Sequence, residues 1–203
     1  MKEETNYTKL ETIFRGNGGF ITRQDADEAL IPSWFLSDFV RRKGLIKLAP
    51  GFYAEADYAP DEYFILQRRY SKYIFSGLSA LYLHHLTDKI PVFMEVTSPQ
   101  GYNPSRQKMG FLSIRRISNP DIYSLGIAEV ETSFGHVVRA YDEERTVCDI
   151  IKARDRYDSE TFIKAIRTYV RNVNNQAKLF EYARAMGIEK KVFEVVEVFA
   201  NEN

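Results

Sequence analysis

The sequence has 203 residues, of which 44% are hydrophobic and 28% charged, and its 28 basic residues balance 28 acidic ones. This composition is typical of a globular protein, and no apolar run approaches the roughly 18 residues of a membrane-spanning helix. A net charge of zero argues against a protein that coats nucleic acid through bulk charge. Because no apolar leader follows Met1, we expect a cytoplasmic protein without a membrane partner.

The length suits two domains, each with its own core. Residues 55–63, "EADYAPDEY", interrupt the apolar pattern as a linker would, so we expect domains at 1–58 and 59–203.

Cys148 is the single cysteine, which excludes an internal disulfide, and its apolar neighbours predict that it faces a core.

The first predicted domain contains three short helices and a hairpin. Residues 7–15 form an amphipathic stretch, and Thr22 and Asp25 occupy the capping-box positions of a second helix. A third helix is expected over residues 34–43, ended by Gly44. The stretch "LIKLAPGFYA" then predicts two short strands joined by a Pro-Gly turn. This order is typical of a winged helix-turn-helix.

One side of the third helix is expected to meet DNA. Arg41 suits a bidentate contact with guanine, whereas the neighbouring cations and the start of the second helix suit phosphates. The predicted DNA-binding residues are Thr22, Arg23, Gln24, Ser33, Trp34, Ser37, Arg41, Arg42, Lys43 and Lys47.

An alternative is a helix-turn-helix fold used only for protein contacts. The first 58 residues hold 8 basic and 9 acidic residues, which is a weak charge for a DNA-binding module. Asp38 lies on the same side as Arg41 and repels phosphate, although its carboxylate can accept from cytosine N4.

The second predicted domain is mixed. "VFMEVTS", "FLSIRRIS" and the hairpin "IAEVETSFGHVVRAY" alternate as strands and predict a small antiparallel sheet. From Asp142 onward the pattern is helical, so a helical C-terminal tail is expected and the fold class is α+β.

We expect no enzymatic activity, no cofactor and no metal. His84 and His85 are adjacent, about 100° apart on a helix, and cannot chelate one ion together. "FMEVTS" resembles a nuclease strand, but Thr97 stands where such a strand carries lysine. The sequence contains no phosphate-binding glycine loop and no nucleophile elbow.

The stretch "YDEERTVCDII" has two interpretations. In the first, Asp142 caps a helix and Arg145 pairs with Asp149 one turn later. In the second, Arg145, Thr146 and Asp149 form an exposed group that contacts a partner.

Two basic groups stand out in the second domain. Lys164, Arg167, Arg171 and Lys178 are spaced by 3, 4 and 7 residues, which predicts one helical face, either a solvated surface or a site for nucleic acid or an acidic partner. Arg115 and Arg116 are adjacent on a strand and are expected to point to opposite faces.

The chain resembles the AbiEi family, the antitoxins of bacterial abortive-infection toxin-antitoxin systems, over nearly its whole length. The segments that carry the resemblance are "LSDFVRRKGLIKLAPGFYA", "SGLSALYLHHLTDKIPVFMEVTSPQG", "VRAYDEERTVCDIIK", "FIKAIRTYV" and "LFEYARAMGI".

The resemblance implies that the first domain binds inverted-repeat operator DNA in its own promoter as a repressor. It also implies that the second domain neutralises a co-encoded nucleotidyltransferase-like toxin without a stable complex. The candidate antitoxin surface comprises Arg115, Arg116, Arg145, Asp149, Lys164, Arg167, Arg171 and Lys178.

The sequence has no heptad seam, so we expect a monomer in solution that binds DNA cooperatively. The alternative function is a ligand-sensing winged-helix transcription regulator.

Overall fold

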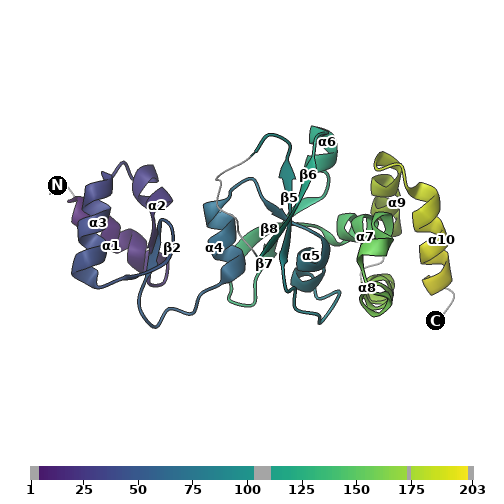
Figure 1. Ribbon diagram of the computed structural model, residues 1–203, viewed down its shortest axis with the longest axis horizontal. Helices are drawn as coiled ribbons and strands as arrows, with labels where there is room; N and C mark the ends of the chain where they lie inside the picture. Colours follow the sequence, from purple (N-terminus) through teal and green to yellow (C-terminus); the bar gives the residue numbers. More distant parts are fainter. Residues whose placement is uncertain (1–4, 103–110, 173–174, 201–203) are drawn as a thin grey trace. The chain divides into compact units, whose positions relative to one another are not determined.

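The protein divides into two compact units, residues 1–69 and 70–203. The computed structural model (Figure 1) describes residues 5–102, 111–172 and 175–200. Both units combine helices with a sheet, so the predicted α+β class is confirmed.

Three helices and a small sheet open the first unit. The helices are α1 (Asn6–Gly16), α2 (Arg23–Glu28) and α3 (Ser33–Lys43). An antiparallel sheet of order β1-β3-β2 is formed by β1 (Phe20–Thr22), β2 (Ile46–Ala49) and β3 (Phe52–Ala54). The three helices and the β2–β3 hairpin were predicted, whereas β1 was not.

Strands β1 and β3 of the small sheet are covered on both faces. Successive residues of a strand point to opposite sides, so Ile21 and Tyr53 pack against the core shared by the three helices. Phe20 and Phe52 stack on the other side, with ring centroids 4.9 Å apart. Their neighbours there include Phe64 and Ile65 of α4 (Glu62–Arg69).

Because α4 covers one face of the sheet, it belongs to the first unit. The expected boundary after residue 58, with residues 55–63 as a linker, would put this helix in the second domain. That stretch instead connects β3 to α4 inside the first unit, and the boundary falls after Arg69 rather than after residue 58.

Local signals fixed the helix ends as predicted. Thr22 and Asp25 form a reciprocal capping box at the start of α2. Gly44 ends α3 in the left-handed region with φ of 67°, where a residue with a Cβ is disfavoured.

The sheet of the second unit has five strands in the order β6-β5-β4-β8-β7. The strands are β4 (Ile74–Phe75), β5 (Met94–Pro99), β6 (Leu112–Ile117), β7 (Ile127–Glu131) and β8 (Val137–Tyr141). Pairs β5–β6 and β4–β8 are parallel, whereas β4–β5 and β7–β8 are antiparallel. The sheet is therefore mixed, and the prediction of an antiparallel sheet was wrong. Alternation along a strand indicates its faces but not its direction relative to a neighbour, which explains the error.

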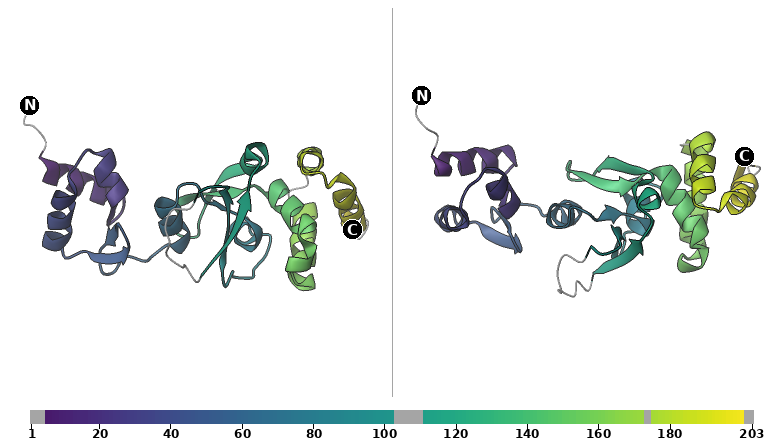
Figure 2. Two further views of the ribbon diagram at one scale, coloured as in Figure 1. Left: turned by 45° about the horizontal axis from the view of Figure 1, so that its top comes forward. Right: turned by 90° about the horizontal axis from the view of Figure 1, so that it is seen from above.

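The helices of the second unit are α5 (Gly77–Leu83), α6 (Pro120–Ser124), α7 (Glu143–Lys152), η1 (Arg154–Arg156), α8 (Ser159–Asn172), α9 (Gln176–Ala185) and α10 (Glu189–Ala200). Figures 1 and 2 show α7 to α10 gathered at one end of this unit, as the predicted helical tail requires. Among the described residues, no helix combines the length and the apolar character needed to cross a bilayer.

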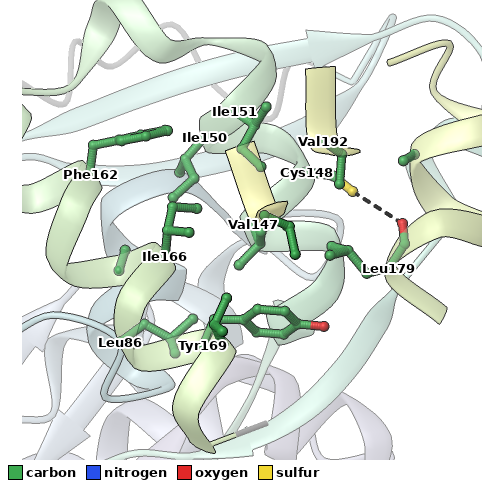
Figure 3. Packing of buried hydrophobic residues seen from close by; sticks show 14 of the residues in the cluster. Leu86, Val147, Cys148, Ile150, Ile151, Phe162, Ile166, Tyr169, Leu179 and Val192 are labelled. Carbon is green, nitrogen blue, oxygen red and sulfur yellow. Dashed lines mark hydrogen bonds between the residues drawn. The ribbon is translucent and has the colours of Figure 1, made fainter. Parts of the chain in front are cut away.

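The helices of the tail enclose the main core of the second unit (Figure 3). Val147 and Ile150 of α7 are fully buried against Ile166 of α8. Cys148 faces the same core, as expected, and its Sγ lies 3.7 Å from the carbonyl oxygen of Leu179. Burial raises the pKa of the Cys148 thiol to about 12, so the thiol stays protonated.

Candidate functional site

The outward side of α3 is the first candidate site. Leu36 and Phe39 are buried and hold the helix on the core. The alternate side exposes Ser33, Trp34, Ser37 and Arg41 to solvent. The predicted division of this helix into a packing face and an exposed face is therefore confirmed.

Two of the α3 cations share one carboxylate. Arg41 Nη2 lies 2.5 Å and Arg42 Nε 2.6 Å from the Asp38 carboxylate oxygens. Hydrogen bonding from Arg41 holds the pKa of Asp38 below its usual value, although desolvation opposes this. Both guanidinium groups are mostly exposed, so these ion pairs can exchange readily for other anions.

Lys43 is held inside the unit. Its Nζ lies 2.8 Å from Glu11 of α1 and 5.3 Å from the centroid of the Phe14 ring. This contact ties the end of α3 to α1. A phosphate would have to compete with Glu11 for this cation, so Lys43 is a weaker candidate than the sequence indicated.

The Thr22 side chain is also bound inside the first unit, so the prediction that it contacts phosphate is wrong. The side chain is buried, and its hydroxyl donates to Asp25 at 2.6 Å. Arg68 of α4 donates to the same hydroxyl and forms an ion pair with Asp25. The sequence did not indicate Arg68, because it lies beyond the expected domain boundary at residue 58.

The start of α2 adjoins the hairpin turn. The Arg23 amide donates to the carbonyl oxygen of Gly51 at 2.7 Å. Arg23 and Gln24 line a hollow of about 560 Å³ together with Arg69, but Arg23 pairs with Asp27 and Gln24 with Glu28. Lys47 is exposed on β2 of the hairpin.

The second unit contains a buried ionic group rather than the exposed one considered above. Arg145 is 0% exposed, and its Nη1 donates to the carbonyl oxygens of Ile122 at 2.6 Å and Leu125 at 2.8 Å. Its Nε lies 3.3 Å from Asp149. Arg115 binds the same carboxylate through two nitrogens, at 2.9 and 2.5 Å.

The interpretation in which Arg145, Thr146 and Asp149 meet a partner directly is therefore wrong, because all three are buried. The interpretation with a cap and an i, i+4 pair is confirmed, since Asp142 accepts from the Arg145 amide. Asp149 joins α7 to β6, and Arg145 joins α7 to the α6 region.

The predicted basic stripe is only partly continuous. Lys164, Arg167 and Arg171 are exposed on α8 and line a shallow hollow of about 500 Å³. Within it, Lys164 pairs with Asp88, and Arg167 lies 6.0 Å from the Phe199 ring.

Lys178 does not belong to that stripe, because α8 ends at Asn172 and Lys178 is on α9. Its Nζ lies 3.0 Å from Asp142 and 2.9 Å from Glu144 of the α7 start. Burial opposes the charge, yet hydrogen bonds to Glu144 and Asp142 raise the pKa of Lys178 above its ordinary value. Lys178 thus fastens α9 to α7.

Arg115 and Arg116 differ as predicted for neighbours on a strand. Arg115 turns toward Asp149, whereas Arg116 is exposed. Of the candidate antitoxin surface, Arg116, Lys164, Arg167 and Arg171 are accessible side chains. Within the described ranges, no group of three His, Cys, Asp or Glu residues is arranged to hold a metal ion.

No protein-family model matches the chain, and no curated protein does. A solved structure with a similar fold is that of the RV2827C protein from Mycobacterium tuberculosis, with a TM-score of 0.61. The match covers 93% of this chain and 74% of that one, at 13% sequence identity. At this identity the likeness concerns the fold alone.

Proposed function

We propose that this protein is an AbiEi-type antitoxin that also represses its own operon. The first unit acts as a winged helix-turn-helix on inverted-repeat operator DNA. The second unit neutralises a nucleotidyltransferase-like toxin encoded beside it. The family assignment rests on the resemblance of the sequence segments quoted above.

The observation that carries the DNA-binding half is the exposed side of α3. A helix that presents serine hydroxyls, an aromatic ring and a guanidinium has the groups that contact base edges in the major groove. Arg42 and Lys47, exposed on α3 and the hairpin, suit the flanking phosphates. In this arrangement α3 is the recognition helix and the β2–β3 hairpin is the wing.

Because the first unit has no net positive charge, its binding to DNA has to rely on contacts with the bases. The first unit has ten basic and eleven acidic residues, so non-specific attraction to DNA is weak and few counterions are released. Asp38 competes with DNA for Arg41 and Arg42. Specific affinity then comes from α3 and from two monomers that meet on an inverted repeat.

The antitoxin half is assigned to the accessible cations of α8. Lys164, Arg167 and Arg171 form a basic strip around a shallow hollow, which suits an acidic surface or a polyanion. Arg115, Arg145, Asp149 and Lys178 contribute indirectly, because their ion pairs hold α7 against β6 and α9.

Fluorescence anisotropy with the DNA upstream of the gene tests the first half. We expect cooperative binding that a scrambled fragment of equal composition does not reproduce; equal affinity for the two fragments refutes operator recognition.

Growth rescue tests the second half, with the adjacent nucleotidyltransferase gene expressed from an inducible promoter. Light scattering of the mixture should give two separate species, each with the mass of a monomer.

A further inference from the structure

The turn between α2 and α3 exposes two large apolar side chains. Leu30, in the turn, is 89% exposed, and Trp34, in the first turn of α3, is 65% exposed. The Trp34 ring contacts Phe35, with centroids 4.5 Å apart. The two residues stand at the beginning of the helix side that carries Ser37 and Arg41.

The backbone at Leu30 is unfavourable for leucine. Its φ is 57°, and its amide and that of Ile31 donate back to Asp27 at 3.1 Å and Ala26 at 2.8 Å. Helices α1, α3, α5 and α9 end with the same pair of bonds. Glycine occupies the left-handed position in α1, α3 and α9, as is usual, and the polar residue His85 occupies it in α5. At Leu30 the Cβ is crowded against the backbone, and the side chain gains no burial in return.

A strained residue with an exposed apolar side chain indicates a functional contact. Two side chains are far too small for a stable interface with a second copy, which needs roughly 800 Å² from each partner. The hydroxyl groups of Ser33 and Ser37 and the guanidinium of Arg41 are exposed on the same side of α3 as Trp34. Such a mixture matches a major groove in which thymine presents a methyl group among donors and acceptors.

We propose that Trp34 and Leu30 read thymine by packing against its C5-methyl group in the operator. This inference rests on the proposed DNA-binding function and gives it a base preference. It assigns specificity to an apolar contact, which salt does not screen, in a unit whose acidic residues outnumber its basic ones by one.

Replacing thymine by deoxyuridine removes the methyl group and leaves base pairing intact. The probe is the DNA upstream of the gene, amplified with either dTTP or dUTP, so the operator need not be known. We expect the full-length protein to bind the uracil fragment about fourfold more weakly for each methyl contacted, and about fifteenfold when each half-site contributes one. Single uracil substitutions then locate the position.

The variants assign the effect to residues. Trp34→Ala combined with Leu30→Gly should bind both fragments equally, at the affinity that the wild type has for uracil DNA. Arg41→Ala should bind more weakly but keep the thymine preference. Phe134→Ala should keep both the thymine preference and full affinity, since Phe134 is a comparably exposed aromatic residue of the second unit. Leu30→Gly should raise the melting temperature while lowering operator affinity.

Specific binding without any thymine preference overturns the inference and leaves the proposed function intact, whereas failure to bind either fragment specifically overturns the proposed function. A thymine preference that persists when Trp34→Ala and Leu30→Gly are combined also overturns the inference, since DNA stiffness then causes it. A mass above the monomer for the wild type that falls to the monomer in Trp34→Ala assigns the patch to a second copy instead.

Discussion

Cutting the chain after residue 58 should leave an unstable first unit, whereas cutting it after Arg69 should leave a folded one. The reason is that β1 and β3 of the small sheet are covered on both faces. Phe20 and Phe52 are each 3% exposed in the full chain, and Phe64 and Ile65 of α4 supply part of their cover. Fragment 1–58 lacks both α4 residues and exposes this face to water.

The size of the effect follows from the apolar contacts. Full burial of one large apolar side chain is worth about 1.5–3 kcal/mol, and Phe64 and Ile65 are mostly buried, so their joint loss costs about 3 kcal/mol. A unit of this size has only about 3–10 kcal/mol of stability. The melting temperature should therefore drop by about 12–24 °C between fragments 1–69 and 1–58.

Far-UV circular dichroism of the two fragments, with thermal and urea melts, measures this difference. Within fragment 1–69, Phe64→Ala should cost about 2 kcal/mol, while Glu62→Ala, an exposed position on the same helix, should change stability by less than about 0.5 kcal/mol. Cooperative melting of both fragments within a few degrees of each other would refute the assignment of α4 to the first unit.

Four further outcomes are expected. Arg41→Ala should cost about 1–3 kcal/mol at the operator, whereas Lys47→Ala should weaken all sequences alike and lower the salt slope by about one, as anisotropy across a salt series can measure. Asp149→Asn should destabilise the second unit by about 3 kcal/mol in urea, because it leaves Arg145 buried without its carboxylate; a loss below about 1 kcal/mol would contradict this. Cys148 should react with a thiol reagent only after unfolding; because its folded pKa of about 12 exceeds the ordinary value of 9.0, its contribution to stability is complete below pH 9 and is lost as pH rises toward 12. Lys164→Glu with Arg167→Glu should abolish rescue from the toxin, and the exposed pair Lys190→Glu with Lys191→Glu should not.

Features of the fold that depend on a few neighbouring residues could be predicted from the sequence. The capping box of Thr22 and Asp25, the Asp142 cap and the Gly44 stop each act within one turn of helix. The two short strands β1 and β4 were not predicted, because three and two residues are too few to show a periodic pattern. The parallel pairing of strands was not predicted either, because it joins residues that are far apart in the sequence.

The candidate sites divide along the same line. The exposed side of α3 follows from helical periodicity, which the sequence contains. The environment of Arg145 does not, because its carbonyl partners, Ile122 and Leu125, lie 23 and 20 residues earlier. Lys178 matched the basic spacing by residue type, but whether acids face it depends on how α9 packs on α7.

The pairing of β4 sets the order in which the two units can fold during synthesis. β4 is the first strand of the second sheet and lies at its centre, but its neighbour β8 arrives late, with Phe75 opposite Ala140. The first unit, by contrast, is complete at residue 69. At about 5–20 residues per second, the rest of the chain needs on the order of ten seconds to emerge. Throughout that time the unit proposed to repress the operon is able to fold, while the unit proposed to oppose the toxin still waits for its central strand to be paired.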